Sequence, residues 1–120
     1  MKWEVGRQNS GYFKKKLLES KKLLFDVYLL KFPQGTMVHS HTDPAVAGFE
    51  HHRINVVYWP AKNGGKLWVK GQVTNGRIVK FRPDIQSHGM TMVYLGTQYI
   101  LSIGWLRKEK DEFSEYEPIY

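Results

Sequence analysis

The sequence has no cysteine in its 120 residues, and this absence removes several kinds of site from consideration. Disulfide bonds, zinc–thiolate centres, iron–sulfur clusters and cysteine nucleophiles are all excluded. Low-complexity tracts are absent too, and 42% of the residues are hydrophobic. Because a chain of this length and composition can bury one hydrophobic core, we expect a single folded domain over residues 1–120.

Long apolar runs are also missing. No stretch approaches the roughly 20 apolar residues that a membrane-spanning helix needs. The N-terminal residues 1–16 lack the apolar segment that is typical of a secretory signal. The sequence therefore predicts a cytoplasmic protein with no membrane association.

The charge of the chain is basic, with a formal net charge of +7 at pH 7. Acidic residues are concentrated in a C-terminal tail, residues 106–120, so the rest of the chain is more basic still. A basic surface can attract nucleic acid or other polyanions. We favour a solubilising surface, because the lysines of residues 14–22 are interrupted by leucines, as in a folded element with one face in water. A nucleic-acid partner is the weaker alternative.

Short segments rich in β-branched and aromatic residues recur along the chain, separated by turn residues. This pattern predicts an all-β sandwich or barrel. Residues 44–51 are predicted to form a loop, and the first twenty residues could begin with a short helix instead of a strand. The predicted strands are 12–18, 22–32, 36–41, 53–59, 66–70, 77–81, 88–94 and 98–106.

Histidines and a carboxylate suggest a metal site. In an extended segment, residues two apart project to the same side, so His39, His41 and Asp43 can share a face. A third ligand must come from a distant strand, and His88 lies at the start of one. Two imidazoles and one carboxylate leave coordination positions open, as in non-haem iron(II) oxygenases. We therefore predict a metal site formed by His41, Asp43 and His88.

The assembled motifs of residues 28–105 resemble the 2-oxoglutarate- and iron(II)-dependent oxygenase superfamily. The resemblance is to its small prolyl-4-hydroxylase-like branch, which includes compact phage members. The residues that carry it are K-F-P-Q-G (31–35), H-T-D (41–43), R-I-N-V-V-Y-W (53–59), N-G-G-K-L (63–67), G-R-I-V-K-F-R-P-D (76–84), H (88) and G-T-Q-Y-I-L-S-I-G-W (96–105).

The resemblance implies a double-stranded β-helix, also called a jelly roll, with Fe(II) bound by His41, Asp43 and His88. It implies 2-oxoglutarate and dioxygen as co-substrates, with ascorbate as a further candidate cofactor. The family oxidatively decarboxylates 2-oxoglutarate and hydroxylates an unreactive C–H bond of a second substrate. A peptide side chain such as proline is the substrate class that the resemblance suggests, and the host cytoplasm is the location implied for a phage-encoded member.

The expected anchor for the distal carboxylate of 2-oxoglutarate departs from the family pattern. The family usually has Arg or Lys where this chain has Gln98, and often Tyr where it has Phe32. We expect a cation elsewhere to replace the missing charge, and Arg53, which follows Asp43 on the next strand, is the first choice. Ser102 on the last strand is also predicted to reach the co-substrate. A different co-substrate, or metal binding without turnover, are the other interpretations.

Three residues are predicted to contact the substrate. His51 and His52 fall in the predicted loop over the site, and Trp59 ends the strand that follows. Loops are the usual place for binding residues, so we expect the loops 44–52 and 60–65 to select the substrate.

Three rival functions stay open at this point. A cupin-type metal protein would use the pair His39 and His41, and the spacing from Pro83 to His88 also fits it, but Glu50 lies too far along the chain for the expected glutamate ligand. A nucleic-acid dealkylase would carry an arginine pair soon after His88, and none is present. A jelly roll without catalysis would leave the histidine and carboxylate pattern unexplained.

Overall fold

The computed structural model describes residues 3–6, 11–73 and 77–108. Every regular element in these ranges is a β-strand, so the predicted all-β class is confirmed. The alternative of a short N-terminal helix is wrong for the described part, where β1 (Glu4–Val5) pairs with β2 (Phe13–Ser20). No described helix is long and apolar enough to cross a membrane.

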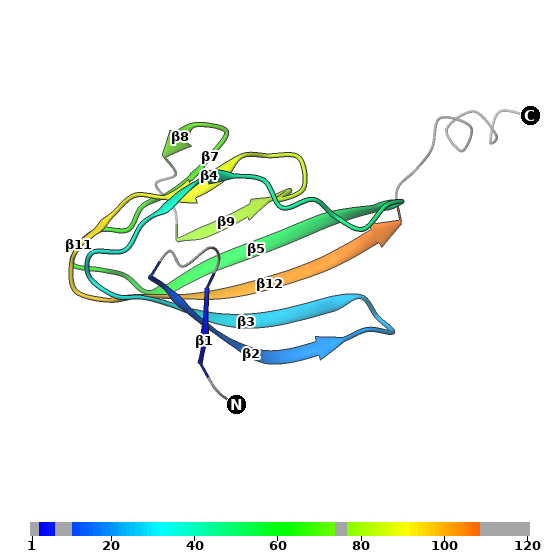
Figure 1. Cartoon of the computed structure of the whole chain (residues 1–120), viewed down its shortest axis with the longest axis horizontal. Coiled ribbons are helices and arrows are strands. Elements are labelled where there is room, and N and C mark those ends of the chain that lie inside the picture. The colour runs from blue at the N-terminus through cyan, green and yellow to red at the C-terminus, as the bar shows by residue number, and fades with distance from the viewer. Residues whose placement is uncertain (1–2, 7–10, 74–76, 109–120) are drawn as a thin grey trace, which may run out of the picture.

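One large antiparallel sheet forms the base of the fold (Figure 1). Its strand order is β1-β2-β3-β12-β5-β9. The last of these strands in the sequence, β12, lies between β3 and β5 and pairs with both. The remaining strands of the sheet beyond β1 and β2 are β3 (Phe25–Phe32), β5 (Phe49–Trp59), β9 (Ile78–Phe81) and β12 (Gln98–Lys108).

Smaller antiparallel sheets lie across from this base (Figure 1). One has the order β4-β10-β7-β8, and the other pairs β11 with β6. Their strands are β4 (Val38–His41), β6 (Asn63–Gly64), β7 (Leu67–Val69), β8 (Gln72–Val73), β10 (His88–Met90) and β11 (Val93–Leu95).

Alternation along β12 shows which face of the large sheet points inward. Gln98, Ile100, Ser102 and Gly104 are buried, whereas the residues between them are partly exposed. A strand with one buried face is expected to alternate in this way. The core between the sheets consists of Phe32, Val57, Leu67, Val79, Phe81, Met90, Val93 and Ile100.

Two sequence predictions about elements need correction. Residues 49–51 are not loop, because β5 begins at Phe49 and pairs with the end of β12, as far as Lys108. The predicted strand 88–94 is divided into β10 and β11, which belong to different sheets. The predicted acidic tail begins within β12, and residues 109–120 lie outside the described residues.

Candidate metal centre

The two histidines of the predicted triad lie on neighbouring strands. β4 and β10 are antiparallel, and His41 is the register partner of His88. Asp43 follows β4, and its backbone N–H donates a hydrogen bond of 2.7 Å to the carbonyl oxygen of Pro83, in the turn before β10. This bond holds the carboxylate segment against the turn that leads to His88.

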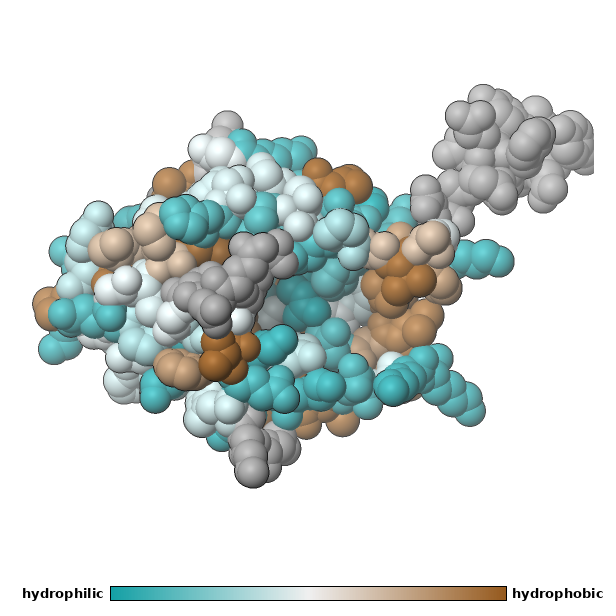
Figure 2. Space-filling view, viewed as in Figure 1, coloured by the Kyte–Doolittle hydropathy of each residue, from teal (hydrophilic) through white to brown (hydrophobic). Residues whose placement is uncertain are grey.

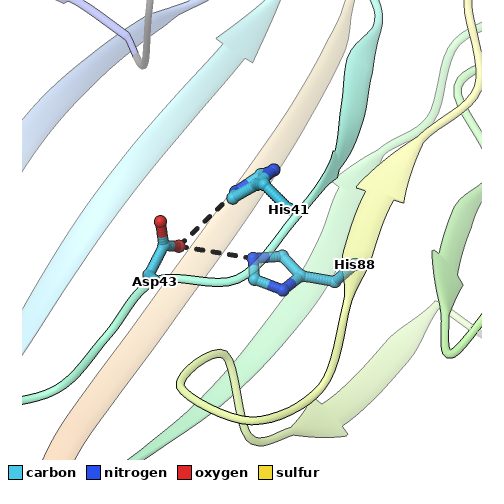
Figure 3. Close-up of side chains that lie close together, drawn as sticks. All are labelled: His41, Asp43 and His88. Carbon is cyan, nitrogen blue, oxygen red and sulfur yellow. Dashed lines mark ion pairs between the residues drawn. The ribbon is translucent and has the colours of Figure 1, made fainter.

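The three side chains converge on one point (Figure 3). The Oδ2 atom of Asp43 lies 3.5 Å from Nε2 of His41 and 3.3 Å from Nε2 of His88. One ligand atom from each residue lies within 4.8 Å of the others. Metal–nitrogen and metal–oxygen bonds of about 2.1 Å place neighbouring ligand atoms roughly 3.0–3.5 Å apart. The two distances from Oδ2 of Asp43 therefore fit ligands of a single metal ion.

Backbone hydrogen bonds fix both imidazole rings. Nδ1 of His41 lies 2.7 Å from the carbonyl oxygen of His39, and Nδ1 of His88 lies 2.9 Å from that of Gln86. A carbonyl oxygen can only accept, so each Nδ1 carries a proton, and Nε2 is the nitrogen of each ring that is left to bind a metal. Metal-binding histidines are commonly oriented by such a bond from their second nitrogen. The donor set and its orientation both fit a divalent transition metal.

His39 does not join the triad. Between the pairs His41↔His88 and Val38↔Met90, β4 has one residue more than β10. Such a bulge shifts the alternation of side chains, so Val38 and His41 both face inward while His39 is exposed. The expectation that His39 shares a face with His41 is therefore wrong.

A cavity of about 570 Å³ lies between the large sheet and the sheet that carries the two histidines. His41, Asp43 and His88 line it on one side, and residues of β2, β3, β5 and β12 line it on the other. In the space-filling view, hydrophilic side chains gather in a hollow near the middle of this face of the molecule (Figure 2). The metal ligands thus face a space that can hold a small molecule.

Arg53 is the centre of a polar network on the opposite wall of the cavity. Its Nη1 donates to Oγ of Ser102 at 2.7 Å, and its Nη2 donates to Oδ1 of Asp26 at 2.6 Å. The hydroxyl of Ser102 in turn donates to Oδ1 of Asn55 at 2.6 Å. The guanidinium group is held in place, and it keeps N–H groups that these contacts do not use.

Two titratable groups of the cavity have shifted pKa values. Burial, followed by the positive charge of Arg53, lowers the pKa of His51 below its usual 6.5. Because this shift favours the neutral imidazole of His51, its Nε2 can accept a hydrogen bond from Nε of Arg53 at 3.4 Å. Burial raises the pKa of Tyr28 above 10.0, so its phenol stays protonated. The cavity therefore offers both neutral hydrogen-bonding groups and a fixed cation.

The remaining predicted site residues are divided between the cavity and other places. Phe32 and Ser102 line the cavity together with Arg53 and His51. Gln98 does not line it. Its Oε1 accepts from the backbone N–H of Ala61 at 3.1 Å, and its Nε2 donates to the carbonyl oxygen of Gly65 at 2.5 Å.

His52 and Trp59 also lie away from the cavity lining. The ring of His52 stacks on Trp105, with ring centroids 5.6 Å apart, and its Nε2 lies 2.9 Å from Oε1 of Glu50. Trp59 is 61% exposed at the end of β5. His51 and His52 belong to β5, so the expectation that they lie in a loop over the site is wrong.

Lys14, Asp26 and Tyr28 are among the cavity residues that the sequence reasoning did not single out. Asp26 and Tyr28 are two apart in a strand whose only other polar residue is Lys31, so they share the inward face of β3. Polar residues at alternate positions of an apolar strand were the signal that could have indicated them.

Comparisons with known proteins identify the fold. No protein-family model and no curated protein matches the sequence. KdgF from Halomonas sp. matches with a TM-score of 0.63 over 94% of this chain and 91% of that chain, at 13% identity. An RmlC-like cupin from Desulfovibrio desulfuricans gives a TM-score of 0.57 over 78% and 81%, at 17% identity. A predicted oxalate decarboxylase from Thermotoga maritima gives 0.57 over 80% and 81%, at 15% identity.

These identities show the fold alone. The chain has the cupin-like double-stranded β-helix of these neighbours, and its triad could bind a metal in it. The double-stranded β-helix that the sequence predicted is therefore confirmed, whereas the 2-oxoglutarate oxygenase activity stays a prediction.

Proposed function

We propose that this chain is a cupin-type metalloenzyme that binds one divalent metal ion through His41, Asp43 and His88. The observation that carries the proposal is the pair of Nδ1–H bonds to backbone carbonyls, which aim both Nε2 lone pairs at the Asp43 carboxylate. The two rings also lie close together, with centroids 4.4 Å apart, so both can reach one ion beside Asp43.

The substrate we propose is a small anion that binds the metal at one end. A bound divalent metal supplies Lewis acidity and, in the case of Fe(II), access to dioxygen chemistry. Three protein ligands leave coordination positions for a chelating group of the substrate. Arg53 attracts a second anionic group from the facing wall, and Lys14 adds a further positive charge to the lining. Asp26 balances part of this charge and orients the guanidinium group.

The protein residues around the metal have positioning roles. Ser102 and Asp26 hold the plane of the Arg53 guanidinium, which can then meet a carboxylate with paired hydrogen bonds. Neutral His51 and Tyr28 can donate or accept hydrogen bonds with hydroxyl or carbonyl groups of the substrate. Phe81, whose ring centroid lies 4.8 Å from that of His88, shields one side of the ligand from water.

A second candidate function is an Fe(II)- and 2-oxoglutarate-dependent dioxygenase. The two-histidine, one-carboxylate donor set favours it, because that set is typical of non-haem iron oxygenases. Arg53 then takes the place of the usual basic anchor for the distal carboxylate, and Gln98 has no part in it. A peptide side chain or another small molecule would be the second substrate.

One experiment separates the two candidates. Fe(II) is added anaerobically to the purified protein, and 2-oxoglutarate and oxalate are then titrated separately while the visible spectrum is recorded. A saturable charge-transfer band with 2-oxoglutarate, followed by succinate formation in air, supports the dioxygenase. Fe(II) binding with a response to oxalate alone supports the broader cupin enzyme.

Two variants give that titration its controls. His88→Ala removes a ligand, so it should abolish every spectral response to the anions. Arg53→Ala keeps the triad, so it should keep Fe(II) binding and weaken the anion response by about tenfold or more, as expected for a lost charge-assisted contact. An anion response that survives His88→Ala unchanged contradicts both candidate functions.

A further inference from the structure

A second cavity, of about 350 Å³, lies at the end of the fold where β5 ends and β9 and β12 begin (Figure 1). Its lining comes from the turn that follows β5, from Arg77 just before β9 and from Gln98 at the start of β12. Among the described residues, only Leu67 lines both this cavity and the cavity of the metal centre, and its side chain is buried. The two cavities are therefore separate spaces with a buried leucine in the wall between them.

The charged side chains that line this second cavity are all positive. They belong to Lys62, Lys66 and Arg77, and we call the space that they line the basic cavity. Within the described residues, no Asp or Glu lines the basic cavity, and no ion pair involves any of its three cations. The sequence gives the reason, because residues 51–83 contain seven Lys and Arg but no Asp or Glu. An anionic ligand would supply the negative charge that these lining residues lack.

Gln98 holds the backbone on which the two lysines stand. Its side-chain amide accepts a hydrogen bond from the backbone N–H of Ala61 and donates one to the carbonyl oxygen of Gly65. These two residues directly precede Lys62 and Lys66 in the chain. Because Gln98 is 2% exposed and uses both polar atoms of its amide in these bonds, it supports the turn and leaves the lysines to meet a ligand.

Bonds to the segment that joins β10 to β12 fix the same turn a second time. The backbone N–H of Lys62 donates to the carbonyl oxygen of Leu95 at 2.9 Å, and that of Lys66 donates to Oγ1 of Thr91 at 2.8 Å. Between the two lysines, Gly65 has a φ of +70°, a conformation that favours glycine. The backbone that carries the two lysines is therefore fixed before any ligand binds, which lowers the entropy cost of binding.

We infer that the basic cavity is a second ligand site and that it binds a phosphate group, either free or as a small phosphomonoester. A phosphate group carries close to two negative charges at neutral pH and has several acceptor oxygens, so it matches three cations better than one carboxylate does. The guanidinium group of Arg77 can meet two phosphate oxygens with paired hydrogen bonds, and each lysine contributes an ammonium group that adjusts its position.

The size and the isolation of the basic cavity agree with this ligand. Its volume of about 350 Å³ lies at the lower end of the range for small-molecule sites, so a phosphate group fits with room for a small organic substituent. The cation of the other cavity, Arg53, does not line it. Phosphate binding should therefore need neither Arg53 nor a metal ion.

The first test is calorimetric titration of the metal-free chain, in low-salt buffer, with inorganic phosphate, glycerol 3-phosphate and glycerol. We expect saturable binding of one phosphate group per chain and none of glycerol. Tighter binding of glycerol 3-phosphate supports the site with a phosphorylated small molecule as its ligand, and equal or tighter binding of inorganic phosphate supports it with free phosphate. If neither compound shows saturable binding, the inference is overturned.

Substitutions locate the bound phosphate. Lys66→Gln and Arg77→Gln should each weaken binding by about tenfold, as expected for a lost charge-assisted contact. Lys70→Gln is the matched control, because Lys70 is exposed, lines neither cavity and loses the same charge. Lys70→Gln and Arg53→Ala should both bind as the wild type does. A loss in Lys70→Gln as large as in Lys66→Gln, or a loss in Arg53→Ala alone, overturns the inference.

A second test needs no substitution. Amide chemical shifts of the isotopically labelled wild-type chain are recorded by NMR while phosphate is added. We expect saturable changes in residues 61–66 and in Arg77, and little change in His41, Arg53 or Ser102, which line the other cavity. Changes confined to those three residues, or small unsaturated changes at lysines all over the surface, would overturn the inference.

Discussion

Arg53 and Gly104 face each other across β5 and β12 so closely that a Cβ atom on Gly104 would overlap the guanidinium group of Arg53. Only glycine leaves this space, because any larger residue at position 104 must displace the cation. The same guanidinium group is held by Ser102 and Asp26. The position of the Arg53 charge in the cavity thus depends on having glycine at position 104 of the neighbouring strand.

Gly104→Ala is expected to move Arg53 and weaken anion binding in the metal-loaded protein by about tenfold, with the metal affinity unchanged. The measurement is calorimetric titration of oxalate or 2-oxoglutarate into the Fe(II) protein without oxygen. Ile103→Val, on the opposite face of β12, is the size control and should bind as the wild type does. Equal affinity in Gly104→Ala and the wild type would show that Arg53 does not hold the anion.

Gln98→Leu is expected to affect stability and leave binding alone. Gln98 is 2% exposed, and its amide satisfies the backbone N–H of Ala61 and the carbonyl oxygen of Gly65. Leucine leaves both groups buried without a partner, which costs about 2 kcal/mol of unfolding free energy. Denaturant unfolding measures this loss. Weaker anion binding in a variant that remains folded would instead place Gln98 in the binding site.

Asp84→Asn is expected to change the acid sensitivity of the fold. Two hydrogen bonds from the Arg82 guanidinium, of 2.9 and 2.5 Å, lower the pKa of Asp84 below 3.8. A carboxyl group whose pKa is lower in the folded chain than in the unfolded chain stabilises the fold at pH values above its unfolded-state pKa. This stabilisation is lost as the pH falls through its folded-state pKa.

The pH range that tests this effect lies below about 4. The melting temperature of the wild type should fall steeply in this range, and Asp84→Asn should show a shallower dependence on pH together with a lower stability at pH 7. Parallel curves for the two proteins would mean that Asp84 gains nothing from Arg82. The turn that holds this pair also supplies Pro83 and Gln86, whose carbonyl oxygens hold Asp43 and His88.

The strands and the metal-binding triad could be predicted from the sequence because both depend on local patterns of residues. Segments rich in β-branched and aromatic residues between turns predicted most strands, and the spacing of His41 and Asp43 with a distant His88 predicted ligands that the structure does bring together. The position of His39 was not predictable, because the bulge that turns it outward exists only in the pairing of β4 with β10.

Other features depended on contacts between distant segments. The partners of Gln98 are backbone groups of residues 61 and 65, and no side-chain pattern indicates them. Asp26 and Arg53 are 27 positions apart in the sequence, so their ion pair in the cavity could be recognised only from the folded structure. The first residues of β5, 49–52, have little strand signal of their own. They form a strand because they pair with the end of β12, which the sequence does not show.

The central claim is that His41, Asp43 and His88 bind one divalent metal ion, and anaerobic calorimetric titration of Fe(II) into the purified chain tests it most directly. We predict one ion per chain for the wild type and for His39→Ala, whose side chain faces outward. His88→Ala should weaken the affinity by about 100-fold or more, because it removes one of three protein ligands. Wild-type affinity in His88→Ala, or loss of binding in His39→Ala, would contradict the site.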